Sequence, residues 1–285
     1  MRIGIDSYSY HRLFGEIRPG ETKPDRIFRR GAHDVLGHAF ALGVDGVSLE
    51  TGFLEERDEL DTAALRETAG ALELVIAWGH RHGLAFGTSE EALRDLLAWL
   101  ELAPRLRCGL VRCVAASPPF RGAEPVAHQI ARTVRPLAAA AARARELGLR
   151  LAIENHGDLC AAEVLELVER VDDPALGVCF DTANALRVGD DPVEAARLLA
   201  PLTLMVHLKD VEALEHVTDP TAGPRSVPYG EGVVAVREVL EELQAARGLE
   251  GLVCVELGQL GPDEDEHALV EQGVAWLRAY ASSNG

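Results

Sequence analysis

The chain has 285 residues, of which 47% are hydrophobic and 26% charged, and its 46 acidic and 28 basic residues give a formal net charge of -18. This composition is typical of a globular protein with a large buried core. The negative charge argues against nucleic acid or an anionic membrane as the partner, because both are bound through Lys and Arg. No apolar run approaches the roughly 20 residues of a membrane span.

The first residues and the cysteines bear on the cellular compartment. Residues 1–6 have the pattern of a strand rather than of a signal peptide. The five cysteines form no Cys-x-x-Cys pair, and several lie in apolar runs, so we expect reduced and mostly buried thiols. Both features favour a cytoplasmic protein.

Eight short apolar runs alternate with longer amphipathic stretches along the chain. The runs are continuously hydrophobic, as expected of parallel strands that are covered on both faces. The pattern predicts strands at residues 3–5, 46–49, 84–86, 110–114, 149–153, 176–180, 202–206 and 252–255. It predicts helices at residues 62–81, 90–102, 125–147, 233–247 and 264–280, and a further helix that begins at Asp191.

This alternation predicts the α/β class, with residues 1–281 forming a single (β/α)8 TIM barrel and residues 282–285 a frayed tail. The alternative is an open doubly wound sheet, but the glycine-rich phosphate loop that usually follows its first strand is absent. Residues 7–24 and 210–231 are too long for ordinary connections between a strand and a helix. Both would project from the carboxyl ends of the strands, where barrel enzymes carry their active sites.

Four consecutive predicted strands end in an acidic residue or a histidine. Glu154, Asp181, His207 and Glu256 are separated by 27, 26 and 49 residues, which correspond to two βα units and a third that includes a long loop. Their side chains would meet at the top of neighbouring strands, where three carboxylates repel one another unless a cation lies between them. This mostly hard set of ligands suits Mn²⁺ or Mg²⁺, with Co²⁺ or Zn²⁺ as alternatives.

Each of these residues also has an ordinary structural interpretation. Asp181 could cap the helix that follows it. A single histidine such as His207 is more often a structural residue than a ligand, and Glu154 or Glu256 alone could be a carboxylate at the rim. The metal-site hypothesis depends on the joint pattern, because all four consecutive strand ends carry residues that bind metals.

The surrounding residues resemble the xylose-isomerase-like superfamily of sugar (phosphate) isomerases and epimerases. The motifs that carry the resemblance are Gly43-Val-Asp-Gly-Val-Ser-Leu-Glu50, Glu154-Asn-His-Gly157, Cys179-Phe-Asp-Thr-Ala-Asn184, Val206-His-Leu-Lys-Asp210 and Tyr229-Gly-Glu-Gly232. The resemblance implies a (β/α)8 barrel with one divalent metal ion, often Mn²⁺, held by the four strand-end residues. In the ketose 3-epimerases of this group, the residues matching Glu154 and Glu256 also move the proton.

Two differences within the superfamily bear on function. Many members have a histidine where this chain has Asn184, and there it contacts the substrate, so we expect Asn184 in the substrate site. The superfamily also contains DNA repair enzymes of the endonuclease IV type. Those enzymes need a basic groove, and the net charge of -18 argues against that activity.

Two further residues follow predicted ligands at a distance of two positions. In an extended backbone, residues two apart point to the same side, so His156 and Lys209 would line the same pocket as Glu154 and His207. Lys209 is one of two lysines in a chain with 26 arginines, which favours a contact with a substrate hydroxyl or carboxylate. The alternative for both is an ordinary loop residue that faces solvent.

Tyr8 and Tyr10 follow the first predicted strand, and Glu50 ends the second. Aromatic rings are common walls for the apolar faces of sugars, so both tyrosines are candidate substrate-binding residues, with packing at the barrel mouth as the alternative. Glu50 would lie near the pocket or pair with an arginine. Basic residues do not cluster at the strand ends, so the sequence does not support a phosphorylated substrate.

These observations predict a metal-dependent isomerase or epimerase of a small sugar or keto-sugar. Glu154 and Glu256 would be the catalytic residues, one removing an α-proton and the other returning a proton, with the metal stabilising the enediolate. A lyase that dehydrates or β-eliminates a related hydroxy-ketone would need the same metal and base. The third interpretation is a non-catalytic barrel that binds a sugar or a partner chain, and the sequence leaves open whether the chain forms a homo-oligomer.

Overall fold

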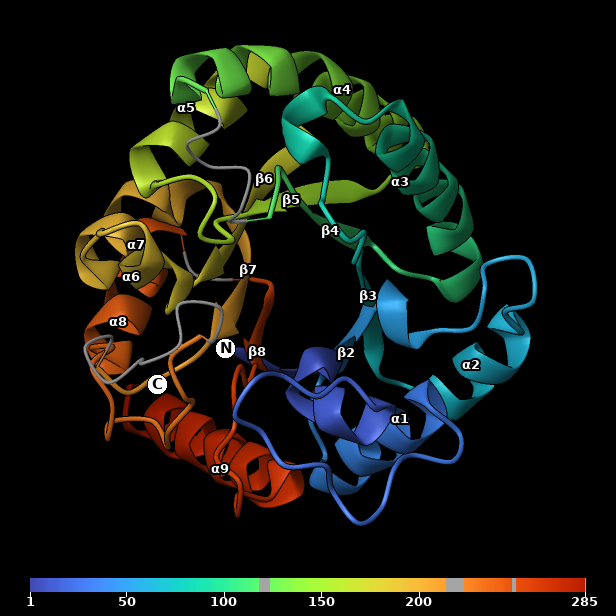
Figure 1. Ribbon diagram of the computed structural model, residues 1–285, viewed down its shortest axis with the longest axis vertical. Helices are drawn as coiled ribbons and strands as arrows, with labels where there is room; N and C mark the ends of the chain where they lie inside the picture. Colours follow the sequence, from blue (N-terminus) through green and yellow to red (C-terminus); the bar gives the residue numbers. More distant parts are fainter. Residues whose placement is uncertain (118–123, 214–222, 248–249, 285) are drawn as a thin grey trace.

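The structure, a computed structural model, describes residues 1–117, 124–213, 223–247 and 250–284. Eight parallel strands form a closed barrel in chain order, and the last strand pairs with the first. Figure 1 looks down into this barrel, which the helices surround. The strands are β1 (Arg2–Asp6), β2 (Gly46–Glu50), β3 (Glu73–Ala77), β4 (Leu110–Val114), β5 (Arg150–Glu154), β6 (Leu176–Asp181), β7 (Thr203–Leu208) and β8 (Leu252–Val255). The predicted (β/α)8 barrel is therefore confirmed.

The helices lie between successive strands on the outside of the barrel. They are α1 (Ala32–Leu42), α2 (Thr62–Ala69), α3 (Glu90–Leu102), α4 (Val126–Glu146), α5 (Ala161–Val171), α6 (Asn184–Arg187), α7 (Pro192–Leu199), α8 (Val236–Arg247) and α9 (Glu266–Asn284). The side chain of Asp191 caps α7, at the position where the sequence predicts a helix start. α9 continues through Asn284, so the chain is still helical beyond residue 281, where the sequence predicts a frayed tail.

The third strand does not lie where the sequence pattern predicts it. The pattern predicts one helix at 62–81 and a strand at 84–86, whereas α2 ends at Ala69 and the strand is β3. Gly70 ends the helix with a φ of 56°, a conformation that favours glycine. The short apolar run that follows is compatible with the period of a helix and with that of a strand. In the structure it pairs within the sheet as β3, where most of its residues are buried. Residues 84–86 instead belong to a tight turn that includes the 3-10 helix η3 (Ala85–Gly87).

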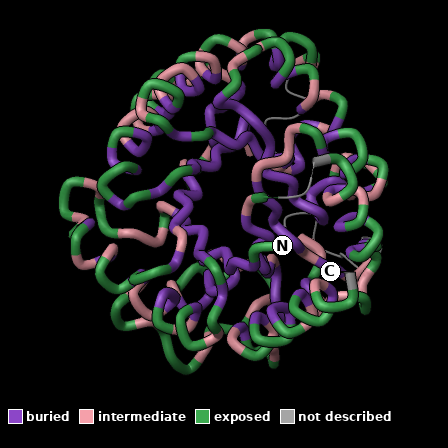
Figure 2. Tube along the Cα trace, turned by 180° about the vertical axis from the view of Figure 1, so that it is seen from behind, coloured by how far each residue is buried: buried purple, intermediate pink, exposed green. Residues whose placement is uncertain are grey.

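The strands are buried on both faces, as Figure 2 shows for the inner ring of the trace. Their outer side chains pack against the helices in one continuous core. A smaller cluster inside the barrel lies below the strand ends and consists of Val75, Leu110, Ala152, Cys179, Met205, Leu252 and Cys254. All five cysteines are free thiols, and four of them are buried. Among the described helices, none combines the length and the apolar character needed to cross a membrane.

The connection after β1 folds against the last βα unit. It begins with the 3-10 helix η1 (Ser7–Phe14). Arg12 is 2% exposed and donates from Nε to Glu266 Oε1 at 2.5 Å, while His11 Nε2 lies 2.9 Å from Glu21 Oε1. These buried contacts hold the connection over the carboxyl end of the barrel.

Replacing Arg12 tests how much this connection depends on its buried ion pair. Arg12→Met leaves the Glu266 carboxylate buried without its cation, and we expect the free energy of unfolding to fall by about 3–5 kcal/mol. The double variant Arg12→Met/Glu266→Met removes both charges and should regain part of that loss. Urea denaturation followed by circular dichroism measures both variants. A single variant within about 0.5 kcal/mol of the parent protein would show that the pair does not hold this connection.

Candidate active site

The four strand-end residues meet at the carboxyl end of the barrel. Glu154 ends β5 and Asp181 ends β6. His207 is the last residue but one of β7, and Glu256 directly follows β8. The strand register places Asp181 beside His207. None of the four is more than 4% exposed. The sequence pattern therefore located a real juxtaposition, although the role of these residues stays a prediction.

His207 is the centre of this group. Its Nδ1 atom lies 2.6 Å from Glu256 Oε2 and 3.6 Å from Glu154 Oε2. Asp181, His207 and Glu256 each offer a potential ligand atom, and these atoms lie within 4.8 Å of one another. Glu154, Cys179 and His207 form a second group of the same kind, so the Cys179 thiol lies at the edge of the site.

The donor atoms fit a divalent cation. Glu154 Oε2, His207 Nδ1 and Glu256 Oε2 are buried and have no hydrogen-bond partner among the described residues. His207 Nδ1 contacts Glu256 Oε2 at 2.6 Å and Arg112 Nε contacts Glu154 Oε2 at 2.9 Å, so these ligand-type atoms lie close together. Buried carboxylates that repel one another are stabilised by a cation in that space, and this donor set suits a hard divalent ion.

The Asp181 carboxylate caps the start of α6 with one oxygen, and its other oxygen faces the candidate metal site. Its Oδ1 accepts hydrogen bonds from the backbone N–H groups of Ala183 and Asn184 at 3.0 and 2.9 Å, at the start of α6. Its Oδ2 accepts a hydrogen bond from Lys209 Nζ at 2.6 Å. The Asn155 side chain bonds both the N–H and the carbonyl of Asp181, at 2.7 and 2.8 Å. One oxygen therefore orients the carboxylate and leaves the other directed at the site.

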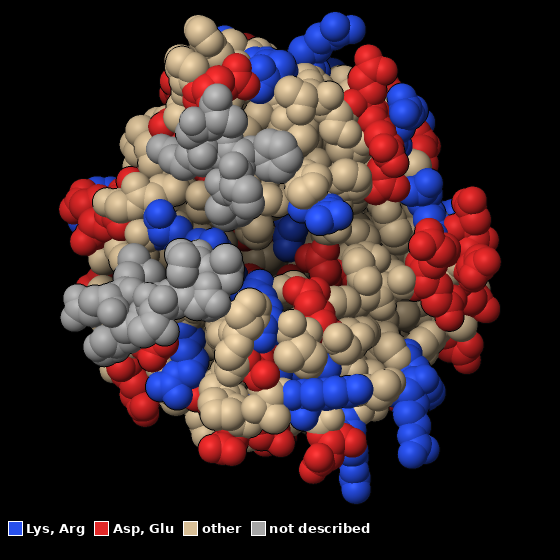
Figure 3. Space-filling model, viewed as in Figure 1, with Lys and Arg blue, Asp and Glu red and all other residues tan. Residues whose placement is uncertain are grey.

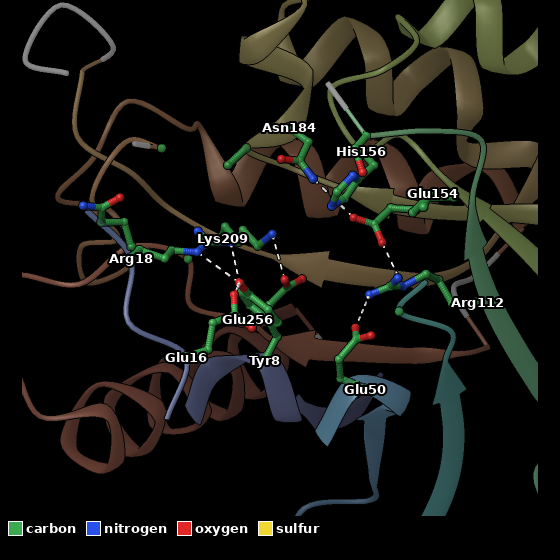
Figure 4. Close-up of a pocket in the computed structure, with 18 of the residues that line it drawn as sticks. Tyr8, Glu16, Arg18, Glu50, Arg112, Glu154, His156, Asn184, Lys209 and Glu256 are labelled. Atoms are coloured by element: carbon green, nitrogen blue, oxygen red, sulfur yellow. Dashed lines mark hydrogen bonds and ion pairs between the residues drawn. The ribbon is translucent and has the colours of Figure 1, made fainter. Parts of the chain in front are cut away.

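Two cations offset the buried carboxylates, as Figure 4 shows. Lys209 Nζ also lies 2.8 Å from Glu256 Oε1. Arg112, on β4, places Nε 2.9 Å from Glu154 Oε2 and Nη2 3.1 Å from Glu50 Oε2. Sequence reasoning missed Arg112, although a lone charge inside the apolar run 110–114 was a usable signal. Glu50 pairs with this arginine, which was one of its two predicted placements.

Asp6 is a second residue that sequence reasoning missed. It is fully buried at the end of β1, and its Oδ2 lies 3.3 Å from His207 Nε2. Its other oxygen accepts the Tyr8 backbone N–H at 2.7 Å. A carboxylate on the far side of a histidine ring orients the ring and keeps the opposite nitrogen available as a ligand. The strand-end criterion that identified the other four residues applies equally to Asp6.

The two pocket-facing glutamates differ in their electrostatic surroundings. Burial raises the pKa of Glu154 to about 7, against the lowering influence of Arg112 and His207. Burial also acts to raise the pKa of Glu256, but His207 and Lys209 hold that pKa well below its usual value. Burial likewise raises the pKa of Glu50 to about 7, although Arg112 opposes it.

A cavity of about 320 Å³ lies above this group. That volume is at the lower end of the roughly 300–1,000 Å³ range of ligand pockets, so the site suits a small molecule. Glu154 and Glu256 line the cavity, whereas Asp181 and His207 lie beneath it. The predicted substrate-binding residues that also line it are Tyr8, Glu50, His156, Asn184 and Lys209.

Tyr10 is an incorrect prediction. It is fully buried away from the cavity, and its hydroxyl lies 2.7 Å from His38 Nδ1. The prediction for both tyrosines was substrate contact, with packing at the barrel mouth as the alternative. Tyr8 and Tyr10 lie in η1, where three residues complete a turn and residues two apart point in different directions.

His156 and Asn184 occupy one wall of the cavity. The His156 ring has no partner for Nδ1 among the described residues, and burial, together with Arg112 and Lys209, lowers its pKa to about 3. The ring is therefore neutral at physiological pH. Asn184 Nδ2 donates to Glu154 Oε1 at 3.2 Å, so this amide contacts a predicted catalytic group.

Comparison with known proteins places this geometry in context. The sequence model of the xylose isomerase-like TIM barrel family matches residues 36–280. The chain is 30% identical to 2-epi-5-epi-valiolone 7-phosphate 2-epimerase of Actinoplanes sp. over 218 residues, which are 73% of this chain and 76% of that protein. It is 27% identical to 3-oxo-isoapionate decarboxylase of Pectobacterium atrosepticum over 127 residues, which are 45% of this chain and 44% of that protein.

The fold also matches solved structures over its whole length. The structure of L-ribulose 3-epimerase superposes with a TM-score of 0.73 at 17% sequence identity, covering 99% of this chain and 95% of that chain. At that identity the likeness concerns the fold.

Metal binding should weaken at acidic pH. A proton on Glu154, whose pKa burial raises to about 7, must leave before the carboxylate can bind a cation. We therefore expect the affinity for Mn²⁺ to fall as the pH decreases below about 7, with more protons released per ion bound. Calorimetric titrations in two buffers of different ionisation enthalpy measure both quantities. An affinity that stays constant from pH 8 to pH 5 would contradict this prediction.

Asp6 should act on the metal through His207. Asp6→Asn retains the shape of the side chain but removes its charge, and we expect metal affinity to fall by about 10–100-fold. Competition with a chelating dye measures the affinity, and circular dichroism checks that the variant is folded. Asp58→Asn, at an exposed position, is the matched control. Equal affinities for the two variants would remove Asp6 from the site.

Proposed function

Because this chain belongs to the xylose isomerase-like TIM barrel family, we propose that it is a divalent-metal-dependent isomerase or epimerase of a small keto-sugar. The observation that carries this proposal is the placement of Glu154 and Glu256, which reach one cavity from β5 and β8, three strands apart in the ring. Two carboxylates on different walls can act on different faces of a carbon atom bound between them. Inversion of a stereocentre needs that arrangement.

The metal ligands in this proposal are Glu154, Asp181, His207 and Glu256. The convergence of buried ligand-type atoms from Asp181, His207 and Glu256 within 4.8 Å supports the assignment. A divalent cation bound there would polarise the substrate carbonyl and stabilise the negative charge that develops when an α-proton leaves. Three carboxylates and one imidazole favour Mn²⁺, with Mg²⁺, Co²⁺ or Zn²⁺ as alternatives.

Proton transfer belongs to the two glutamates. One removes the α-proton, and the other returns a proton to the opposite face. Arg112 holds the Glu154 carboxylate at 2.9 Å, and Lys209 holds the Glu256 carboxylate at 2.8 Å. Both carboxylates are therefore fixed before the substrate binds, and the configuration of the substrate decides which of them acts first.

The remaining wall positions the substrate. Lys209 and Asn184 present donors next to the two glutamates, and the neutral His156 ring offers a further hydrogen-bonding group. The ring of Tyr8 stacks on Phe53 with centroids 5.7 Å apart and forms an aromatic part of the wall. These groups suit a small, hydroxyl-rich molecule.

A lyase is the second candidate function. The relative from Pectobacterium atrosepticum is named a decarboxylase, although the match covers less than half of that protein. Loss of a carboxyl group next to a carbonyl develops the same negative charge as loss of an α-proton, and β-elimination begins with that loss of the α-proton before the β-substituent leaves with its electron pair. Product analysis separates the reactions, because an epimerase yields a stereoisomer and a lyase yields a shortened or unsaturated product.

The decisive experiment follows the substrate α-hydrogen in deuterated water. The metal-loaded protein should incorporate solvent deuterium at the α-carbon of a ketose substrate, as detected by proton NMR. Glu154→Gln and Glu256→Gln should each reduce the rate by about 10²–10⁴-fold, since the amide keeps the shape but cannot accept the proton. Asp181→Asn and His207→Gln should instead weaken metal affinity, with activity partly restored by excess metal.

Glu166→Gln, at an exposed position on α5, is the matched control and should retain the full rate. Normal turnover without deuterium incorporation would refute proton transfer by the two glutamates. Failure to bind any divalent ion would refute the metal site and favour a non-catalytic barrel.

A further inference from the structure

The cavity is lined by more positive than negative side chains, in a protein whose net charge is -18. Among the described residues, five cationic and four acidic side chains line it. Figure 3 shows Lys and Arg side chains beside the hollow near the centre of this face, together with acidic side chains. A concentration of positive charge at the mouth of an acidic protein needs a physical explanation.

Two of the five cations are already neutralised by the floor of the site. Arg112 and Lys209 contact its carboxylates at 2.6–3.1 Å. The other three are Arg18, Arg81 and Arg187. Within the described parts of the chain, none of these three has a carboxylate oxygen within 4.0 Å. Their guanidinium groups are therefore available to a ligand.

Arg18 is held in place on the connection after β1. Its Nη2 and Nε atoms donate to the Tyr8 hydroxyl at 2.6 and 3.0 Å, and its guanidinium carbon lies 4.8 Å from the centre of the Tyr8 ring. The Tyr8 hydroxyl donates in turn to Glu16. Glu16 is thus engaged by Tyr8, and the Arg18 side chain lines the cavity with Nη1 not used in the bonds to Tyr8.

Arg187, the last residue of α6, lines the same cavity. It packs over Gly157, where a Cβ atom would lie 3.3 Å from Arg187 Cδ and Nε. Gly157 has a φ of 78°, so the backbone itself favours a residue without a side chain here. Both Arg18 and Arg187 line this cavity, and burial together with the positive charge of Arg18 lowers the pKa of Arg187.

We propose that the substrate carries an anionic oxygen group, a carboxylate or a phosphate, that binds between Arg18 and Arg187 while its keto-hydroxyl end lies over Glu154 and Glu256. This inference rests on the proposed function and adds the charge class of the substrate. Guanidinium groups bind carboxylate and phosphate oxygens through paired hydrogen bonds.

The proposal revises the expectation drawn from the sequence. Arg112 belongs to β4 and Lys209 directly follows β7, but the three arginines without a carboxylate contact do not lie at strand ends. They come from the connections after β1, β3 and β6, which are far apart in the sequence and meet only when the barrel closes.

Anion binding tests the proposal without any need for turnover. Inorganic phosphate and malonate are titrated into the protein by calorimetry, with and without bound Mg²⁺, and erythritol serves as the neutral probe. We expect at least one anion to bind and erythritol not to compete with it. Arg187→Gln and Arg18→Gln should weaken anion binding by about 10–100-fold, while Arg187→Lys retains part of it. Preference for phosphate or for malonate identifies the anionic group.

Arg135→Gln, at an exposed position on α4, is the matched control and should bind the anions as the parent protein does. Failure of both anions to bind, or unchanged binding by Arg187→Gln, would overturn the proposal. The kinetic counterpart compares D-fructose with D-fructose 6-phosphate as substrates for deuterium exchange. Equal KM values would contradict the anionic substrate and leave the epimerase proposal intact. Anion binding without deuterium exchange on any ketose would contradict the epimerase proposal and leave the anion site intact.

Discussion

The constraint on which the rest of the structure depends is the burial of several carboxylates at one end of a closed barrel. Strand pairing brings them there irrespective of their mutual repulsion, because each stands at the end of a strand whose position the ring dictates. In a low-dielectric interior, several carboxylates can stay ionised side by side only if positive charges lie between them. The buried carboxylates are Asp6, Glu50, Glu154, Asp181 and Glu256, and the cations that contact them are Arg112 and Lys209.

These contacts explain how the site can be rigid and still have polar atoms that could bind a ligand. The strands fix the backbone of each acid, and the two cations fix the side chains without neutralising all of them. Among the described residues, oxygens on Glu154 and Glu256 and a nitrogen on His207 take part in ion-pair contacts but in no hydrogen bond. Buried polar atoms without hydrogen bonds are costly, so a ligand that completes them would stabilise this end of the barrel.

Much of this could be predicted from the sequence, and the failures have physical causes. The four strand-end residues were found because a polar residue at the end of an apolar run is conspicuous. Arg112 lies inside such a run and was overlooked. Its charge in an apolar run was a signal, but the local sequence does not show which carboxylates it contacts. The position of β3 was missed because a short apolar run fits two periodicities, and Tyr10 because a 3-10 turn does not alternate as a strand does. Contacts between distant connections, such as Tyr8 with Arg18 and the cavity wall, depend on the closed ring.

The order of the strands has a consequence for how such a site can diversify. The four candidate metal ligands all belong to the second half of the chain, on β5 to β8, whereas Arg18, Glu50 and Arg112 belong to the first half. The surroundings of these four residues nevertheless come from both halves, because Asp6 and Arg112 contact His207 and Glu154, and Asn184, Arg187 and Lys209 line the cavity. The connection after β1, which carries Tyr8 and Arg18, supplies part of the cavity wall but none of the four candidate ligands, so sequence changes there can alter the shape of the wall while all four stay in place.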